Sequence, residues 1–221
     1  MQEYDLHAMC MHVHYNNSIP YTNFSTVVNY LKPAVNFNME TGPWIAGGIV
    51  RELLTNRDWD QSDSDIDIFV KNDEQLLEVE QQLERLTNTI PSHYLHPCLS
   101  KIHESENAIT YEYKCGSKVL IVQLIHHIFE NVEAIIDKFD FTISQFVTDG
   151  KVFCVGDTTL FDLGMKQIRI NKITYPVSSL QRLIKYSKKG YKACNQTLSD
   201  FLILMANNED VIIQTKFLYI D

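Results

Sequence analysis

The stretch WIAGGIVRELLTNRDWDQSDSDIDIFV, from Trp44 to Val70, decides the fold. It opens with three apolar residues and a Gly-Gly pair, Gly47 and Gly48, and continues with apolar residues spaced as in a helix. It closes on residues 65–70 (DIDIFV), in which polar and apolar side chains alternate as in a half-buried strand. The stretch therefore predicts a strand, a tight turn, a helix and a second strand.

Two carboxylates mark the second of these strands. Asp65 and Asp67 are two residues apart and point to the same face of a strand. Like charges so close are unfavourable unless a cation lies between them, and oxygen ligands suit Mg2+. Gly47 and Gly48 fit the same function, because without a Cβ their backbone N–H groups can approach a phosphate at a helix start. An isolated Gly-Gly or Asp-x-Asp also occurs without any ligand, so the order of the elements carries the specificity.

That order resembles the nucleotidyltransferase superfamily that includes DNA polymerase beta. GGIVRELL…SDIDIF is most similar to the head domain of class II tRNA nucleotidyltransferases and bacterial poly(A) polymerases, whose pattern is Gly-Gly-x-Val-Arg-Asp-x-Leu-Leu followed by Asp-x-Asp. Residues 139–147 (FDFTISQFV) resemble their Arg-Arg-Asp-Phe-Thr segment, and residues 157–169 (DTTLFDLGMKQIR) resemble a later stretch. The resemblance covers about Trp44 to Arg169.

The resemblance implies metal-dependent transfer of a nucleotide from an NTP, with Mg2+ or Mn2+ as cofactor. It assigns catalysis and metal ligation to Asp65, Asp67 and a third carboxylate. The predicted central strand at residues 118–125 (KVLIVQLI) offers only Gln123, so we expect Asp140 to be that carboxylate. The nucleotide-binding residues implied in the same way are Gly47, Gly48, Arg51 and Lys138.

The departures from the family pattern leave three hypotheses open. Lys138 and Phe139 stand where the family has two arginines, and the base-reading Glu-Asp-x-x-Arg motif is not evident after Arg169. The first hypothesis is transfer of NMP to a nucleic-acid 3′ end, most readily a tRNA-like RNA. The second is transfer to a protein hydroxyl or a small molecule, and the third is a non-catalytic binding or regulatory module.

Charge bears on the acceptor. The net charge of −9 argues against a general nucleic-acid coat, because such binding needs many phosphate-neutralising cations. Yet residues 166–192 contain eight of the 19 basic residues and no acidic one. This basic region is either a solvated helix face or a contact surface for a polyanionic substrate. The expected acceptor or phosphate contacts within it are Lys166, Arg169, Arg182, Lys185, Lys188 and Lys189.

Length and composition bound the architecture. With 221 residues and 45% apolar content, the chain suits one globular domain with a helical appendage. We expect an α/β fold, a small mixed β-sheet with flanking helices, in a head at residues 1–172 (core 44–169) and a helical neck-like extension at 173–221. No membrane span or signal peptide is evident, so a cytoplasmic protein without membrane partners is expected. The five scattered cysteines are expected to be reduced thiols.

The remaining elements follow from periodicity and turn residues. Ser178 or Ser179 is expected to cap the helix after Pro176. Expected helices lie at residues 24–37, 72–88, 131–138, after Pro176, and 198–207, and expected hairpins join 108–113 to 118–125 and 145–147 to 151–155.

Overall fold

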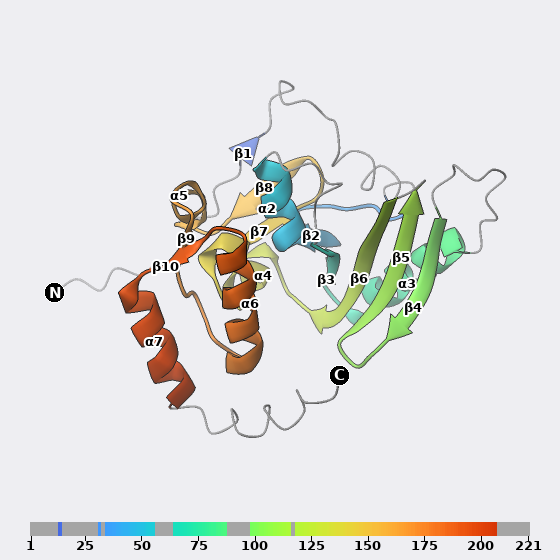
Figure 1. Cartoon of the computed structure of the whole chain (residues 1–221). Helices are drawn as coiled ribbons and strands as arrows, with labels where there is room; N and C mark the ends of the chain where they lie inside the picture. The colour runs from blue at the N-terminus through green and yellow to red at the C-terminus, as the bar shows by residue number, and fades with distance from the viewer. Residues whose placement is uncertain are drawn as a thin grey trace.

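An eight-stranded mixed sheet with flanking helices forms the body of the molecule, and its strand order is β1-β8-β7-β2-β3-β6-β5-β4 (Figure 1). The structure is a computed structural model that describes residues 13–14, 31, 34–55, 64–87, 98–115 and 118–206. A second sheet pairs β9 (Gln167–Ile168) with β10 (Lys192–Ala193) in parallel. The large sheet consists of β1 (Val13–His14), β2 (Trp44–Ala46), β3 (Ile66–Val70), β4 (Cys98–Glu104), β5 (Ala108–Cys115), β6 (Lys118–Ile128), β7 (Phe146–Thr148) and β8 (Val152–Val155).

The stretch from Trp44 to Val70 contains the predicted strand, turn, helix and second strand. Strand β2 runs antiparallel to β3, and β3 runs parallel to β6 in the middle of the sheet. Between β2 and β3, the turn at Gly47 leads into helix α2 (Gly48–Leu54). Gly47 has φ +88°, which only glycine adopts at little cost, so the tight turn requires this residue. The strand–turn–helix–strand order therefore centres the sheet on β3.

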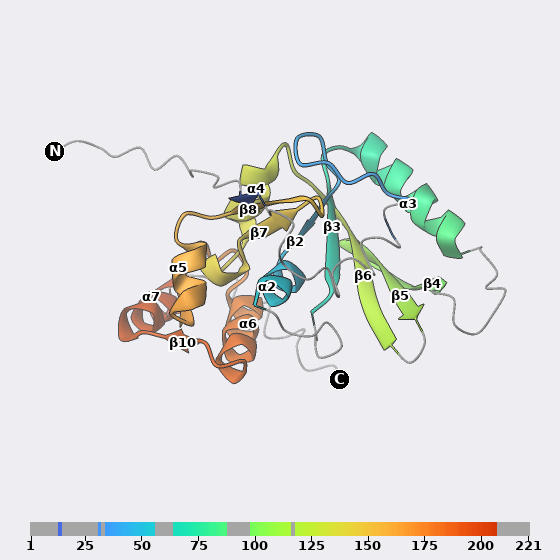
Figure 2. The same cartoon turned by 90° about the horizontal axis from the view of Figure 1, so that it is seen from above.

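Helix α3 (Asp73–Thr87) covers one face of the β3–β6–β5–β4 half of the sheet (Figure 2). Asn72 caps it, because its Oδ1 accepts a hydrogen bond of 2.8 Å from the Gln75 amide. The β5–β6 hairpin was predicted correctly. Strand β4 carries no such signal in the sequence, since its residues 100–104 are all exposed and show no apolar alternation.

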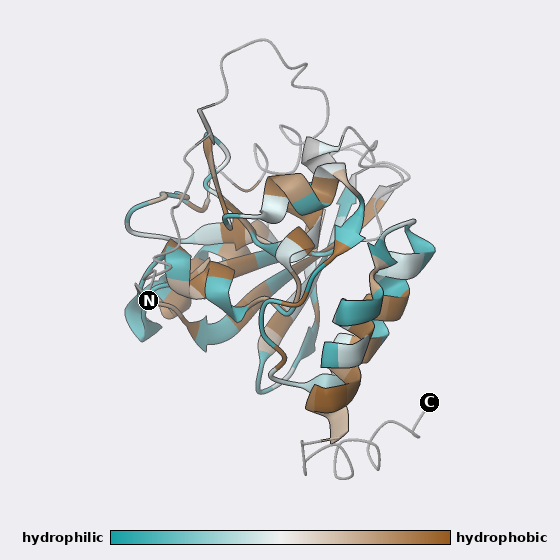
Figure 3. Ribbon diagram, turned by 90° about the vertical axis from the view of Figure 1, so that its left-hand side faces the viewer, coloured by the Kyte–Doolittle hydropathy of each residue, from teal (hydrophilic) through white to brown (hydrophobic). Residues whose placement is uncertain are grey.

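On the other side of β3, helix α4 (Val132–Lys138) begins after Asn131, whose side chain accepts from the Ala134 amide. The 3-10 turn η2 (Thr142–Ser144) follows, and the predicted β7–β8 hairpin turns at Asp149-Gly150. The Asp149 carboxylate accepts from the two amides that follow Gly150. Apolar residues gather in the central strands (Figure 3).

Three helices end the described chain: α5 (Thr159–Gly164), α6 (Pro176–Lys188) and α7 (Asn195–Ala206). Phe141 and Ile143, at the turn η2, share a small core with Leu183 of α6 and Phe201 of α7. Helices α6 and α7 therefore pack against η2. The prediction that a serine caps α6 is wrong. The helix begins at Pro176, a residue well suited to a first turn, and Ser179 lies inside it, donating its hydroxyl to the Tyr175 carbonyl.

The helix expected at residues 24–37 falls mostly outside the described residues. Cys154 forms a disulfide, so the expectation that all five cysteines are reduced is wrong. Within the described part of the chain, every helix is too short or too polar to cross a bilayer.

Candidate active site

The Asp-x-Asp pair lies at the middle of the sheet. Asp65 directly precedes β3, Asp67 lies within it, and both side chains are half-buried. Among the described residues, no donor reaches the buried Oδ1 of Asp67. Burial and, secondarily, the charge of Asp65 raise the pKa of Asp67 to about 7, against the opposing influence of Arg182 and Lys185. The Oδ1 of Asp67 is therefore a buried carboxylate oxygen that a cation would stabilise.

The strand pairing defines what surrounds Asp67. It is in register with Ala46 of β2 on one side and Gln123 of β6 on the other. Side chains of paired residues point to the same face, so Gln123 is the nearest cross-strand neighbour of the carboxylate on β6. The position beside Asp67 on β6 is therefore a neutral amide.

The glycine pair shapes the space beside Asp67. A Cβ added to Gly47 would lie 3.5 Å from Asp67 Oδ2, and a Cβ on Gly48 would lie 3.0 Å from Ser64 Oγ. The Gly47 N–H donates to the Phe146 carbonyl at 2.9 Å, so this N–H is already used within the fold. The expected contact of Gly47 with a phosphate stays a prediction. Gly48 is the first residue of α2, whose leading N–H groups have no partner within the helix.

Arg51 contacts the carboxylate of its neighbour Glu52, with Nη2 3.5 Å from Oε1. Its guanidinium is almost fully buried and lies 4.7 Å from the ring centroid of Tyr186 and 5.6 Å from that of Tyr191. It also donates to the Ile143 carbonyl at 3.4 Å. These contacts place Arg51 in the packing between α2 and α6, and none of them supports the expected role in binding a nucleotide.

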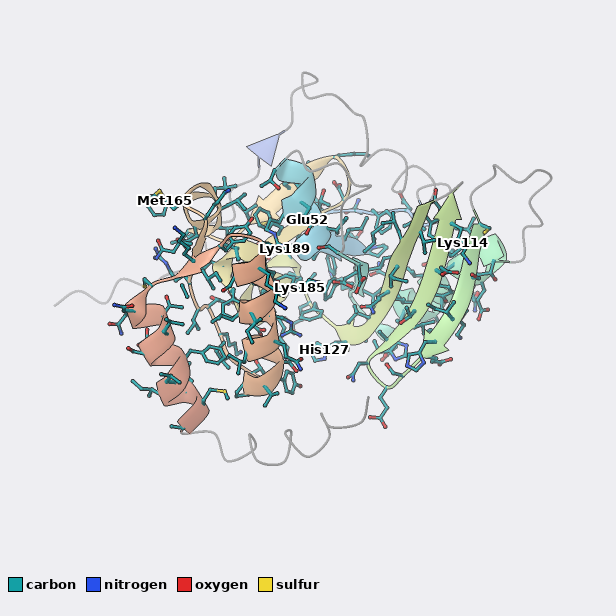
Figure 4. All side chains as sticks on the ribbon, viewed as in Figure 1. Glu52, Lys114, His127, Met165, Lys185 and Lys189 are labelled. Atoms are coloured by element: carbon teal, nitrogen blue, oxygen red, sulfur yellow. The ribbon has the colours of Figure 1, made fainter. Side chains whose placement is uncertain are left out.

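Glu52, the residue after Arg51, was not among the predicted site residues. Its buried carboxylate accepts from Ser64 Oγ at 2.8 Å and from Lys189 Nζ at 2.5 Å. Figure 4 shows Lys189 beside Glu52, at the end of α6. The signal was present, since Glu52 occupies the acidic position of the Gly-Gly-x-Val-Arg-Asp pattern. Because Ser64 precedes Asp65, Glu52 links the end of α6 to the start of the Asp-x-Asp strand.

Asp140, the expected third carboxylate, is bound by Arg182 of α6. Its backbone carbonyl also accepts from the amides of Asn171 and Lys172, at 2.8 and 3.2 Å. No three His, Cys, Asp or Glu residues gather into a metal-binding group in the part of the chain that the structure describes. Asp140 as a third metal ligand therefore stays a prediction, while its observed contact is an anchor for Arg182.

The basic region is partly neutralised by acidic partners elsewhere in the chain. Arg169 pairs with Asp162 at 3.1 Å, in addition to the pairs that hold Arg182 and Lys189. Lys185 is exposed and close enough to Asp67 to lower its pKa. For Lys138, Lys166 and Lys188, the described residues show no contact with the carboxylate pair. Of the expected contacts, only Arg182 and Lys185 thus act on the pair.

This arrangement is a nucleotidyltransferase fold, and the solved structures that resemble it agree. The Thermotoga maritima CCA-adding enzyme complexed with tRNA is 19% identical, with a TM-score of 0.51 over 80% of this chain and 41% of that one. A CCA-adding enzyme with CTP is 19% identical, with a TM-score of 0.54 over 81% and 41%. An apo form II of a CCA-adding enzyme is 18% identical, with a TM-score of 0.52 over 86% and 45%.

The chain belongs to the Gad2 family, described as Gabija anti-defense 2 family protein, whose model matches residues 10–166. No curated protein sequence matches at a significant level. The chain spans less than half the length of these CCA-adding enzymes. At 18–19% identity these structures share the fold with this chain. A shared fold does not fix the activity or the substrate, which depend on the site.

Proposed function

We propose that the chain is a metal-dependent nucleotidyltransferase that transfers NMP from an NTP to an acceptor hydroxyl. The observation that carries the proposal is the buried, unpartnered Oδ1 of Asp67 beside Asp65, faced by the cations Arg182 and Lys185. An unpaired buried carboxylate oxygen is costly, and it is tolerated where a ligand completes it.

The residues present fit a divalent metal. Asp65 and Asp67 would hold Mg2+ or Mn2+, which would act as a Lewis acid on the phosphate oxygens. Lys185 and Arg182 would bind the triphosphate, and the Asp140 carboxylate would hold Arg182 in place for this role. Gly47 adds no side chain between Asp67 Oδ2 and the Phe139 ring, each 3.5 Å from where a Cβ would lie, and this would keep Oδ2 open to a ligand.

The anti-defense family gives the reaction a biological setting. In this proposal, nucleotidyl transfer would disable a component of the Gabija defense. The neighbours' titles name tRNA, CTP and ATP, which favours an NTP donor and keeps an RNA 3′ end as one acceptor. Arg169, Arg182 and Lys189 each pair with an acidic residue of the same chain. These pairs neutralise part of the basic region at residues 166–192, which was the support for an RNA acceptor.

A second candidate function is NTP binding without transfer. The neutral Gln123 beside Asp67 favours it, because a site with two carboxylates holds metal more weakly than one with three. Such a module would bind a metal–NTP complex and release it unchanged.

One experiment separates the two. The chain would be incubated with each α-labelled NTP, Mg2+ or Mn2+, and a pool of RNA and protein acceptors, beside an Asp65→Ala/Asp67→Ala variant. Label that enters an acceptor with the wild type alone supports the transferase. NTP binding by a folded wild type with no transfer of label would instead identify the binding module.

A further inference from the structure

The face of β4, β5 and β6 that points away from α3 continues directly from Asp67, because Gln123 of β6 is paired with that residue. Of the described elements, only α3 packs broadly on these three strands, and it lies along one side of them (Figure 2). Tyr111 and Tyr113 point toward α3 and are buried there. Their strand neighbours Thr110 and Glu112 therefore point to the opposite face, which no described helix covers.

A row of polar side chains crosses this face from the candidate metal site. Asp67, Gln123, Thr110 and His103 are paired in register across β3, β6, β5 and β4. Gln123 and Thr110 are half-buried and His103 is exposed. With strands about 4.8 Å apart, the row extends roughly 14 Å outward from Asp67. We call these four residues the polar row.

The two flanks of Asp67 differ in charge. On the α6 flank lie Arg182 and Lys185. On the sheet flank, Lys114 is engaged by Glu112, with Nζ 2.5 Å from Oε1, and the described strands place no other lysine or arginine on this face. A triphosphate is therefore best held on the α6 flank, and a group without phosphate charge is best held on the sheet flank.

Resting on the proposed function, we infer that the acceptor is a protein hydroxyl whose segment docks over the polar row. Gln123, Thr110 and His103 offer hydrogen bonds that suit a polypeptide backbone, and Ile121 beside them is half-buried. Val119, 51% exposed, extends the aliphatic surface. An RNA strand needs a cation for each phosphate that it places and aromatic faces for its bases. On this face the described strands offer Lys114, which Glu112 already engages, and the imidazole of His103, so its capacity for RNA is small.

The proposed transfer needs only the acceptor hydroxyl and the NTP. The acceptor oxygen forms a bond to the α-phosphorus, while the bond from that phosphorus to the β-bridging oxygen breaks. The products are a protein–NMP phosphodiester and pyrophosphate, and the hydroxyl proton passes to the solvent. The NTP bound on the α6 flank is the only co-reactant.

The test uses a cation placed in the polar row. Thr110→Arg adds bulk and positive charge to the sheet flank, and Gln81→Arg adds the same group to the exposed side of α3 as a matched control. Each variant and the wild type would be given α-labelled NTP with Mg2+ or Mn2+. The acceptors would be nuclease-treated protein from a bacterial lysate and, separately, purified total RNA from that lysate. Thermal unfolding and Mg2+–NTP binding would verify that Thr110→Arg keeps its fold.

We expect label in the protein pool with the wild type and with Gln81→Arg, and about a tenfold loss with Thr110→Arg, because a docked segment cannot cover an added guanidinium. Label in RNA that rises with Thr110→Arg would overturn the inference and leave the transferase standing. Equal protein labelling by Thr110→Arg and the wild type would also overturn it. Label in neither pool would overturn the inference together with the proposed function.

Discussion

Glu52 and Lys189, 137 positions apart in the sequence, form a buried ion pair with Nζ 2.5 Å from Oε1. The same carboxylate accepts from Ser64, the residue before Asp65. One buried charge pair thus joins three elements: the helix after the Gly-Gly turn, the start of the Asp-x-Asp strand, and the end of α6. It provides a physical link between α6 and the candidate metal site.

Loss of one partner of this pair should be costly. Lys189→Met would leave the Glu52 carboxylate buried without its main counter-charge, and we expect a loss of about 3–5 kcal/mol in the free energy of unfolding. Glu52→Gln combined with Lys189→Met should recover part of it, because the buried carboxylate is then absent, while Arg51 loses the charge of its neighbour Glu52. Urea unfolding of the two single variants and the double variant measures the coupling. Additive losses would contradict the link.

Lys185 should affect the donor nucleotide. Its charge lowers the pKa of Asp67, whereas Lys188, one turn further along the same helix, is not among the charges that shift that pKa. We expect Lys185→Ala to raise the KM for NTP about tenfold, the value of one charge-assisted contact. Lys188→Ala serves as the control and should leave KM within about twofold, because exposed charges away from a site contribute little. Similar KM values for both variants would remove Lys185 from the triphosphate site.

Stability should depend on pH through Asp67. Its pKa in the folded protein is about 7, raised from its ordinary value by burial and by Asp65. Protonated Asp67 therefore contributes stability fully below about pH 4, and this contribution is lost as the pH rises to 7. In EDTA, the wild type should lose more stability than Asp67→Asn between pH 5 and pH 8.

Added Mg2+ should restore the stability of the wild type at pH 8 and leave that of Asp67→Asn nearly unchanged, because the metal needs the ionised carboxylate. Melting temperatures across pH, with and without Mg2+, measure both effects. Parallel curves for the two proteins would mean that Asp67 does not titrate in this range.

Gly47 should tolerate no side chain. At φ +88°, an alanine there is strained by about 1–2 kcal/mol, and its Cβ would lie 3.5 Å from Asp67 Oδ2. We expect Gly47→Ala to lower both stability and nucleotide transfer. Gly164→Ala, where a Cβ meets nothing within 4 Å, is the matched control and should keep full activity. Equal behaviour of the two variants in thermal unfolding and transfer assays would contradict the role of the turn.

The sequence alone determined the elements around Asp65 and Asp67. The Gly-Gly turn, the alternation of residues 65–70 and the apolar run of β6 are local signals, because backbone preference and strand periodicity act over a few residues. For that reason the α/β class, the main hairpins and the carboxylate pair could be predicted.

The tertiary structure decided which charges meet. Asp140 binds Arg182, Glu52 binds Lys189, and Arg51 lies against Tyr186, each across a long separation in the chain. Such pairings depend on how α6 packs against α2 and on which groups lose water, and neither follows from spacing along the sequence. The same holds for the polar row, since only strand register places Gln123 and Thr110 in line with Asp67.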